Sequence, residues 1–228
     1  MSKDIELLPA YDFRGHLSKN PNYARKLRKF SINELEALDG DGWIIKDNFF
    51  GQDVSVVRTE AESYYQEGRL QSSEMGQHTG AWNDNKTRGD VIIWLNGDRR
   101  NALEEKSPIM NKLIQKIDSL RKELNEACEL DSHHTQIQLA CYPGSATHYV
   151  THLDSYVGGA RRRVTVLYYM NLGWKPEDGG CLRIHKSDGT TFDVEPIADR
   201  LLVFQSRRVW HEVLPSYSHR YALATWFY

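Results

Sequence analysis

Two histidines, one aspartate and one arginine near the end of the chain have types and spacing that could support metal chemistry. His152 and Asp154 are separated by one residue, and His211 follows later in the chain. Two imidazoles and one carboxylate form a facial triad that leaves half of an octahedral metal shell open, as in non-haem Fe(II) oxygenases. Arg220, beyond His211, carries a permanently charged planar fork suited to a carboxylate. Together they predict an iron site that binds a 2-oxo acid co-substrate.

The pair His152 and Asp154 is weak evidence by itself. The chain has 9 histidines, so one falls near an acid often, and a hydrogen-bonded surface or core pair is the alternative. His211 and Arg220 lie on the last two predicted β-rich runs, and this spacing favours a metal site over an incidental pair. The absence of a cysteine ligand argues against a structural zinc site. The rival histidine ligands are His148, His185 and His219.

Length, charge and cysteine content limit the kinds of protein that this chain can be. The chain has 228 residues, 40% hydrophobic and 26% charged, which is typical of one globular domain with its own core. A net charge of -2 gives no overall signal for nucleic acid, and no apolar run predicts a membrane span. The three cysteines lie far apart and the chain starts without an apolar signal segment. We therefore expect a monomer in a reducing cytoplasmic or nuclear compartment, without nucleic-acid or membrane partners.

The first half of the chain predicts mostly helices. Residues 1–30 are polar and are expected to form an irregular N-terminal arm. Ser31 and Glu34 form a capping box that opens a short helix, and residues 42–46 predict a strand. Helices are expected over 52–67 and, with apolar residues on one face, over 109–128.

From residue 137 the pattern changes to short β-rich runs separated by Gly, Pro, Asp and Asn. These runs are 137–142, 164–171, 181–185, 191–194, 201–205, 211–214 and 221–228. The expected fold is therefore α+β. One domain over 31–228 would have a double-stranded β-helix core (jelly-roll or cupin-like) at about 137–228, supported by N-terminal helices. Residues i and i+2 of a strand share a face, so His152 and Asp154 could both point into the barrel mouth.

The β-rich half also carries a series of short motifs in a fixed order. They are Tyr142–Gly144, Tyr149, His152–Asp154, Arg162–Thr165, Tyr168–Tyr169, Gly179–Arg183, Glu195–Pro196, Asp199–Phe204, His211–Val213 and Arg220–Ala222, with Arg88–Asp90 and Trp94 upstream. In this order they resemble the catalytic domain of the Fe(II)/2-oxoglutarate-dependent prolyl hydroxylases, most of all the hypoxia-inducible-factor prolyl hydroxylases. The resemblance covers about residues 35–228. The segments 155–160 and 206–210 depart from the family's pattern.

The resemblance implies roles for individual residues. His152, Asp154 and His211 would bind Fe(2+), with O2 as a co-substrate and L-ascorbate as an expected further cofactor. Arg220 would pair with the far carboxylate of 2-oxoglutarate, and Tyr169 would hydrogen-bond the same end. The other residues implied in the co-substrate pocket are Tyr142, near the oxo-acid end, and Thr165, Leu182 and Val213. Tyr168 and Tyr169 alternate along a strand, so only one of them can point inward.

The resemblance also implies the reaction, which is 4-hydroxylation of a prolyl residue in a protein, with an oxygen-sensing hypoxia-inducible factor as the expected substrate. The peptide would pass Arg162 and Trp226, and Arg88 and Asp90 would end a mobile loop over about 71–90. The alternatives are a proline in a ribosomal or translation-factor protein, a small-molecule substrate, or a non-catalytic jelly-roll binding module. The basic run 161–163 is either a solvated turn or a contact surface for an acidic or extended peptide.

Overall fold

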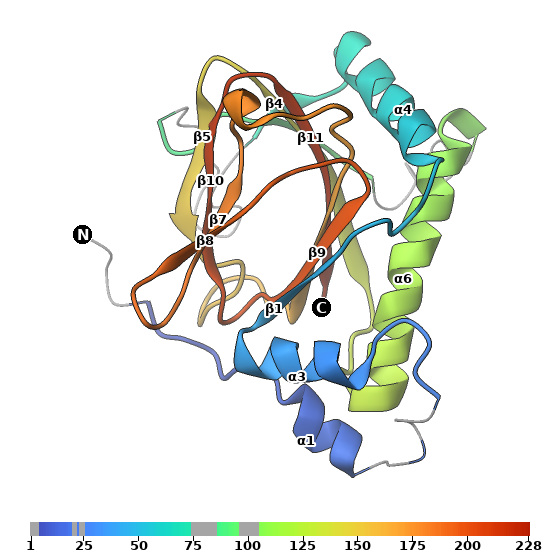
Figure 1. Ribbon diagram of the computed structural model, residues 1–228, viewed down its shortest axis with the longest axis vertical. Helices are drawn as coiled ribbons and strands as arrows, with labels where there is room; N and C mark the ends of the chain where they lie inside the picture. Colours follow the sequence, from blue (N-terminus) through green and yellow to red (C-terminus); the bar gives the residue numbers. More distant parts are fainter. Residues whose placement is uncertain (1–4, 20–21, 23–25, 74–85, 96–104) are drawn as a thin grey trace.

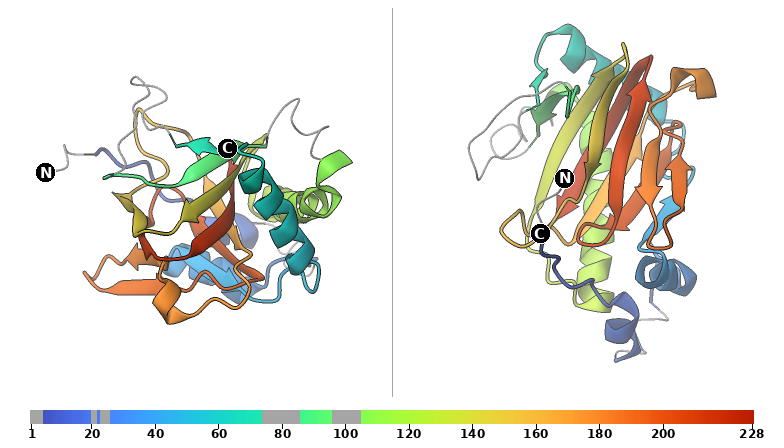
Figure 2. Two further views of the ribbon diagram at one scale, coloured as in Figure 1. Left: turned by 90° about the horizontal axis from the view of Figure 1, so that it is seen from above. Right: turned by 90° about the vertical axis from the view of Figure 1, so that its left-hand side faces the viewer.

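The core of the protein is a sandwich of two antiparallel β-sheets (Figures 1 and 2). The computed structural model describes residues 5–19, 22, 26–73, 86–95 and 105–228. The large sheet has the strand order β1-β9-β6-β11-β4-β3-β2, and the small sheet has the order β5-β10-β7-β8. This is the predicted jelly-roll core.

The strands have short and regular bounds. Those of the large sheet are β1 (Trp43–Lys46), β2 (Gln71–Ser72), β3 (Val91–Trp94), β4 (Thr135–Pro143), β6 (Val164–Tyr169), β9 (Arg200–Gln205) and β11 (His219–Phe227). Those of the small sheet are β5 (Thr147–His152), β7 (Leu182–His185), β8 (Thr191–Val194) and β10 (Trp210–Ser216). A single-turn 3-10 helix, Pro176–Asp178, precedes β7.

Helices cover the outer face of the large sheet (Figure 1). They are α1 (Phe13–Ser18), α3 (Ile32–Gly40), α4 (Val54–Gln66) and α6 (Pro108–Cys128). The long helix α6 buries an apolar stripe that includes Leu113, Ile117 and Leu124, and this stripe joins one core cluster with Leu139 and Leu223 of the large sheet. None of the described helices combines the length and hydropathy that a membrane span requires.

Strand alternation divides the core into two layers. On β11, Leu223 packs toward the helices, whereas Ala222 belongs to the cluster between the two sheets. On β6, Tyr168 likewise packs with the helical side and Tyr169 lies in the inner cluster with Leu182. The predicted alternation of the two tyrosines is therefore confirmed. The face of β11 that points between the sheets carries the residues that form the site.

Most predicted elements are confirmed, with small shifts at their ends. The capping box is present at the start of α3, where the Ser31 hydroxyl accepts from Glu34 N and the Glu34 carboxylate accepts from Ser31 N over 2.7 Å. The N-terminal arm is not wholly irregular, because Phe13 and Leu17 anchor helix α1 in the core. Strands β2 and β3 are not among the predicted runs, whereas β5 (Thr147–His152) contains His152, for which an extended strand is expected.

The expected loop over 71–90 is only partly described. Its start is strand β2, which pairs with β3, so this part is ordered by backbone hydrogen bonds to the sheet. Its end, from residue 86, lies beside β5, where Gly89 N donates to His148 O over 2.9 Å. Residues 74–85, on which most of the loop prediction falls, lie outside the described residues.

Candidate metal centre

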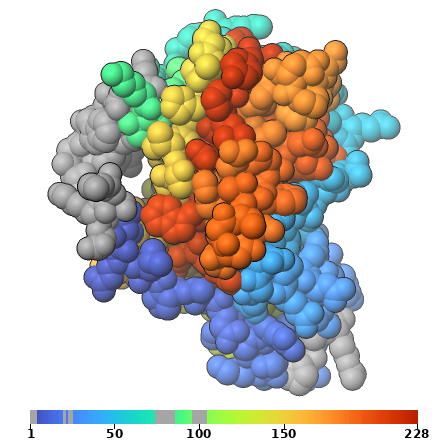
Figure 3. Space-filling view, turned by 60° about the vertical axis from the view of Figure 1, so that its left-hand side comes forward, coloured from blue at the N-terminus to red at the C-terminus, as the bar shows by residue number. Residues whose placement is uncertain are grey.

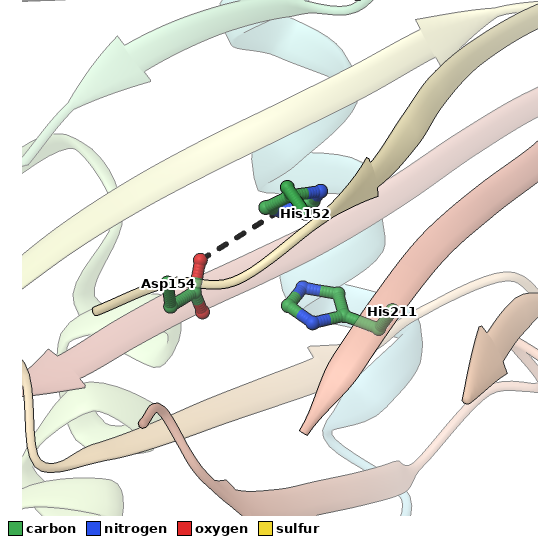
Figure 4. Close-up of side chains that lie close together, drawn as sticks. All are labelled: His152, Asp154 and His211. Atoms are coloured by element: carbon green, nitrogen blue, oxygen red, sulfur yellow. Dashed lines mark ion pairs between the residues drawn. The ribbon is translucent and has the colours of Figure 1, made fainter. Parts of the chain in front are cut away.

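Strands β5 and β10 bring the three predicted metal ligands together. His152 ends β5 and is paired in register with His211 at the start of β10, and Asp154 lies two residues beyond the strand (Figure 4). The ligand atoms of the three residues all lie within 4.8 Å of one another. His152 Nε2 lies 3.7 Å from Asp154 Oδ1. The expectation that Asp154 is itself on the strand is wrong, because the chain leaves the sheet after His152, but the carboxylate still reaches the imidazole.

Backbone carbonyls fix the orientation of both imidazoles. His152 Nδ1 lies 2.8 Å from Val150 O, and His211 Nδ1 lies 3.0 Å from Val209 O. A histidine whose Nδ1 donates to a carbonyl presents an unprotonated Nε2 to a metal. Burial and the neighbouring His211 lower the pKa of His152 to about 3, so the imidazole stays in the neutral form that binds metals.

One oxygen of the Asp154 carboxylate accepts hydrogen bonds from the protein, and the other faces the imidazole of His152. Thr165 Oγ1 donates to Oδ2 over 2.6 Å, and Trp226 Nε1 donates to the same oxygen over 3.0 Å. Oδ1 faces His152. Burial alone would raise the pKa of this carboxyl, but His211, the Arg162 guanidinium, His152 and the Thr165 hydrogen bond lower it below its usual range. Two imidazole nitrogens and one ionised oxygen within 4.8 Å of one another are the donor set that suits Fe(II).

Aromatic rings pack around the imidazoles. The Tyr149 ring stacks on His152 with centroids 3.8 Å apart, and the edge of Phe204 meets His211 at 4.7 Å. The rings limit rotation of both ligands and shield them from water. Sequence reasoning gave neither residue a role. Tyr149 was noticed only as part of a motif, and its stacking depends on a register shift between β5 and β10.

Deeper between the sheets, Arg220 and Tyr169 lie side by side. Arg220 is buried, and its Nε donates to Gly180 O over 2.6 Å. Arg220 Nη2 and the Tyr169 hydroxyl are both buried without a hydrogen-bond partner in the described structure. Burial raises the pKa of Tyr169 to about 12, so the hydroxyl keeps its proton. An orphaned guanidinium nitrogen beside an orphaned phenol fits the far carboxylate of 2-oxoglutarate, because unpaired buried donors are costly.

Further predicted pocket residues surround this pair. Tyr142 lies opposite Arg220 in the β4–β11 register, and the Arg220 guanidinium stands 5.0 Å from the centroids of both the Tyr142 and Tyr169 rings. Leu182 and Val213 are buried on β7 and β10, where they form a register pair. Thr165 instead directs its hydroxyl to Asp154 and to Ser206 Oγ, 2.8 Å away. Its predicted role in lining the co-substrate pocket stays a prediction.

Arg88 and Asp90 form a buried ion pair beside the metal centre. Arg88 Nε and Nη2 donate to the two Asp90 oxygens over 2.6 and 2.8 Å, and Nη2 also reaches Gln138 Oε1 at 3.0 Å. The guanidinium stands 4.7 Å from the centroid of the Tyr149 ring, which in turn covers His152. The structure thus places the pair behind a ligand as well as at the end of the predicted loop. Contact with substrate stays a prediction.

Arg162 and Trp226 lie on the other side of Asp154. Arg162 Nη1 is 3.6 Å from Asp154 Oδ1, and its guanidinium stacks 4.0 Å from the centroid of the Trp226 ring. The predicted role of both residues in substrate binding stays a prediction, and their contacts show that they also hold the ligand carboxylate. This second role could not be found from spacing, since Arg162 and Trp226 belong to different strand regions.

The rival histidines do not join the metal centre. His148 Nε2 faces Lys86 O at 3.0 Å, His185 Nε2 faces Glu212 Oε1 at 3.0 Å, and the ring of His219 packs on Tyr65. Within the described part of the chain, the triad is the one group of three such side chains placed to bind a metal ion.

Comparison with known proteins agrees with this geometry. Residues 137–228 match the 2OG-Fe(II) oxygenase superfamily. The chain is 36% identical to "Prolyl hydroxylase EGLN3" of Mus musculus, over 82% of this chain and 78% of the relative. It is 32% identical to "Hypoxia-inducible factor prolyl hydroxylase" of Caenorhabditis elegans, over 89% of this chain but only 28% of that longer protein.

A solved structure shows the same fold with a similar sequence. It is the prolyl hydroxylase of Trichoplax adhaerens in complex with a hypoxia inducible factor oxygen degradation domain peptide fragment. It superposes with a TM-score of 0.74 at 31% identity, over 94% of this chain and 93% of that one. The chain therefore belongs to the 2OG-Fe(II) oxygenase superfamily and, within it, to the prolyl hydroxylases that use Fe(II), 2-oxoglutarate and O2.

Proposed function

We propose that this protein hydroxylates a prolyl residue in a protein substrate, with a hypoxia-inducible-factor-type sequence as the first candidate. Two relatives support this proposal. One is named a hypoxia-inducible factor prolyl hydroxylase, and the structure of the other was solved with a peptide fragment of the hypoxia inducible factor oxygen degradation domain. The proposal extends the activity of these relatives to this chain.

The main support for the proposal is a pair of buried hydrogen-bond donors, from Arg220 and Tyr169, that have no partner in the described structure. The far carboxylate of 2-oxoglutarate would supply a partner to each of them, Arg220 Nη2 and the Tyr169 hydroxyl. A non-catalytic jelly roll would gain nothing from two unsatisfied polar groups in its core, each of which destabilises the fold by roughly 1–3 kcal/mol. The donors and the intact triad favour a working oxygenase.

The residues of the chain bind, orient and shield the reactants. When bound, Fe(II) and 2-oxoglutarate couple oxidative decarboxylation of the 2-oxo acid by O2 to hydroxylation of a C–H bond. Arg220 and Tyr169 would anchor the 2-oxo acid, and His152, Asp154 and His211 would hold the metal. Tyr149 and Phe204 keep water from the imidazoles.

The oligomeric state, the cellular location and the use of L-ascorbate are part of the same proposal. We propose that the chain acts as a monomer in the cytoplasm or nucleus and that L-ascorbate sustains turnover. All three cysteines are free thiols, which suits a reducing compartment. Size-exclusion chromatography coupled to light scattering tests the monomeric state, and immunofluorescence of the tagged protein tests the location.

The central experiment is mass spectrometry of peptides after incubation with the purified chain, Fe(II), 2-oxoglutarate and ascorbate. The first peptide is a hypoxia inducible factor oxygen degradation domain fragment, and its control has the proline replaced by alanine. We expect a gain of one oxygen on the proline and none on the control. The protein controls are His152→Ala and Asp154→Ala, which should lose turnover but stay folded, because the apolar core does not depend on the metal.

The outcomes separate the alternatives. Oxygen gain only on prolines of ribosomal or translation-factor peptides would replace the proposed substrate and keep the reaction. Succinate production without oxygen gain on any proline peptide would contradict prolyl hydroxylation. Near-normal turnover of either triad variant would contradict the metal assignment.

A further inference from the structure

The hydroxyl group of Tyr228, the residue that follows β11, lies between two other polar side chains. Arg162 Nε donates to this hydroxyl over 3.1 Å, and the hydroxyl donates to Gln136 Oε1 over 2.6 Å. A phenol has one proton to donate and lone pairs with which to accept, so both bonds form together. The motifs that resemble the family include Arg162 but neither Tyr228 nor Gln136, so spacing along the chain gave no indication of this contact.

Both the ring and the backbone of Tyr228 are fixed by the start of β4 and the residues before it. The ring stacks on His134 with centroids 4.6 Å apart and planes 18° apart. Tyr228 N donates to His134 O over 3.1 Å, and His133 N donates to Tyr228 O over 3.2 Å. Gln136 lies opposite Trp226 in the β4–β11 register. The hydroxyl therefore has a defined position relative to the large sheet.

Arg162 connects this hydroxyl to the metal centre. Its guanidinium stands 4.0 Å from the centroid of the Trp226 ring, and its Nη1 lies 3.6 Å from Asp154 Oδ1. A charge-assisted N–H···O hydrogen bond is about 2.7–2.9 Å long, so the guanidinium and the carboxylate attract each other without being hydrogen-bonded. The two side chains are only 18% and 7% exposed, so water screens this attraction weakly.

The distance between Arg162 and Asp154 matters because Oδ1 is the oxygen on the side of the imidazoles. Oδ2 already accepts hydrogen bonds from Thr165 and Trp226, whereas Oδ1 faces His152. An arginine that donated to Oδ1 would compete with a metal ion for this oxygen. It would also bring a positive charge closer to the ion. Any contact that keeps the guanidinium at its present distance therefore favours metal binding.

We propose that Tyr228 is a positioning residue of the metal centre, because its hydroxyl keeps the Arg162 guanidinium from closing on Asp154 Oδ1. The inference concerns metal binding and does not depend on which protein the enzyme hydroxylates. A mostly buried N–H that loses its acceptor takes another one within reach, because an unpaired buried donor is costly. Oδ1 is ionised and already lies 3.6 Å from Nη1, so the arginine would move to it if the hydroxyl were absent.

Mn(II) titrations followed by electron paramagnetic resonance test the proposal without turnover. Tyr228→Phe removes the hydroxyl but keeps the ring that stacks on His134. We expect its Mn(II) affinity to be roughly tenfold lower than that of the wild type, as for other groups that orient metal ligands. Tyr217→Phe is the control, because this tyrosine is 62% exposed in the turn between β10 and β11, and it should bind Mn(II) as the wild type does.

A double-mutant cycle shows whether Tyr228 acts through Arg162. Arg162→Met keeps an unbranched side chain beside Trp226 but has no N–H to donate. In the Arg162→Met background, Tyr228→Phe should change the Mn(II) affinity by roughly twofold at most, because the two changes then no longer interact. A tyrosine that only supported the fold would lower the affinity equally in both backgrounds.

Two results would overturn the role of Tyr228: an unchanged Mn(II) affinity in Tyr228→Phe, or an equal loss of affinity in the Arg162→Met background. A crystal structure of metal-free Tyr228→Phe gives an independent check. The distance from Arg162 Nη1 to Asp154 Oδ1 should shorten to about 2.8 Å, and an unchanged distance also overturns the proposal. Failure of prolyl hydroxylation is detected separately, by the absence of oxygen gain in the mass spectrometry described above, and leaves these binding measurements valid.

Discussion

The Trp226 indole and the Asp154 carboxylate are linked by a hydrogen bond of 3.0 Å from Nε1 to Oδ2. Thr165 donates to the same oxygen. Two donors therefore hold Asp154 Oδ2, while Oδ1 lies 3.7 Å from His152 Nε2. A tryptophan near the end of β11 thus occupies one oxygen of a carboxylate on another segment and leaves the other oxygen to the imidazole side.

Trp226→Phe should weaken metal binding without unfolding the protein. The phenyl ring keeps the stacking with Arg162 but loses the donor, and partners of this kind change metal affinity by roughly 10–100-fold. Electron paramagnetic resonance of Mn(II) titrations measures the affinity. Trp94→Phe is the control, since Trp94 packs on Trp226 at 5.6 Å without reaching Asp154. Equal Mn(II) affinities in the wild type and Trp226→Phe would show that Thr165 alone fixes the carboxylate.

Arg220→Ala should raise the 2-oxoglutarate requirement far more than it changes metal affinity. Loss of a buried charged partner is worth roughly 2–5 kcal/mol, or about 30- to 4,000-fold in affinity. Tyr169→Phe should show a smaller loss, because it removes one neutral donor. The apparent KM for 2-oxoglutarate and the Mn(II) affinity are measured in parallel, with Arg183→Ala on the outer face of the small sheet as the control. An unchanged KM in Arg220→Ala would remove this residue from the co-substrate site.

Gly180→Ala should act on Arg220 at a distance from the metal. Gly180 has φ +72, and a Cβ there would meet Arg220 Cδ and Ser216 Oγ, each at 2.8 Å. We expect a higher KM for 2-oxoglutarate in addition to a loss of stability of roughly 1 kcal/mol from the left-handed backbone. Gly189→Ala separates the two effects, since Gly189 has φ +83 but open space around it. If both variants show the same KM, the contact with Arg220 is unimportant.

Asp90→Ala should destabilise the fold. The Asp90 side chain is 0% exposed and that of Arg88 is 14% exposed, so removing the acid leaves a buried guanidinium without its partner. The expected loss in the free energy of unfolding is roughly 3–5 kcal/mol. Asp193→Ala breaks the pair with Arg183 on the outer face of the small sheet and should reduce the free energy of unfolding by about 0–1 kcal/mol. Figure 3 shows this side of the molecule, with β7 and β8 in orange. Urea denaturation measures both values, and similar losses in the two variants would contradict a structural role for the buried pair.

The order of the motifs determined the family and the metal ligands. His152, Asp154, His211 and Arg220 were identified from residue type and spacing, because the ligand set that iron requires is small and unusual. The amphipathic pattern of α6 and the short β-rich runs predicted a helix-backed jelly roll for the same reason, since alternation and helical period are local properties of a sequence. A strand is expected at His152, but the bounds of β5 do not follow from the sequence because its residues are mostly half-exposed and show no clear alternation.

Tertiary structure alone decided the contacts that tune the site. Trp226 and Thr165 reach Asp154 from β11 and β6, and Tyr149 covers His152 only because the β5–β10 register shifts between them. Hydrogen bonds likewise join the 161–163 loop to the 206–207 turn, two basic segments that are far apart in the chain. Spacing along the chain carries no information about such pairs, because strand register and sheet packing set the distances between residues that are far apart in sequence.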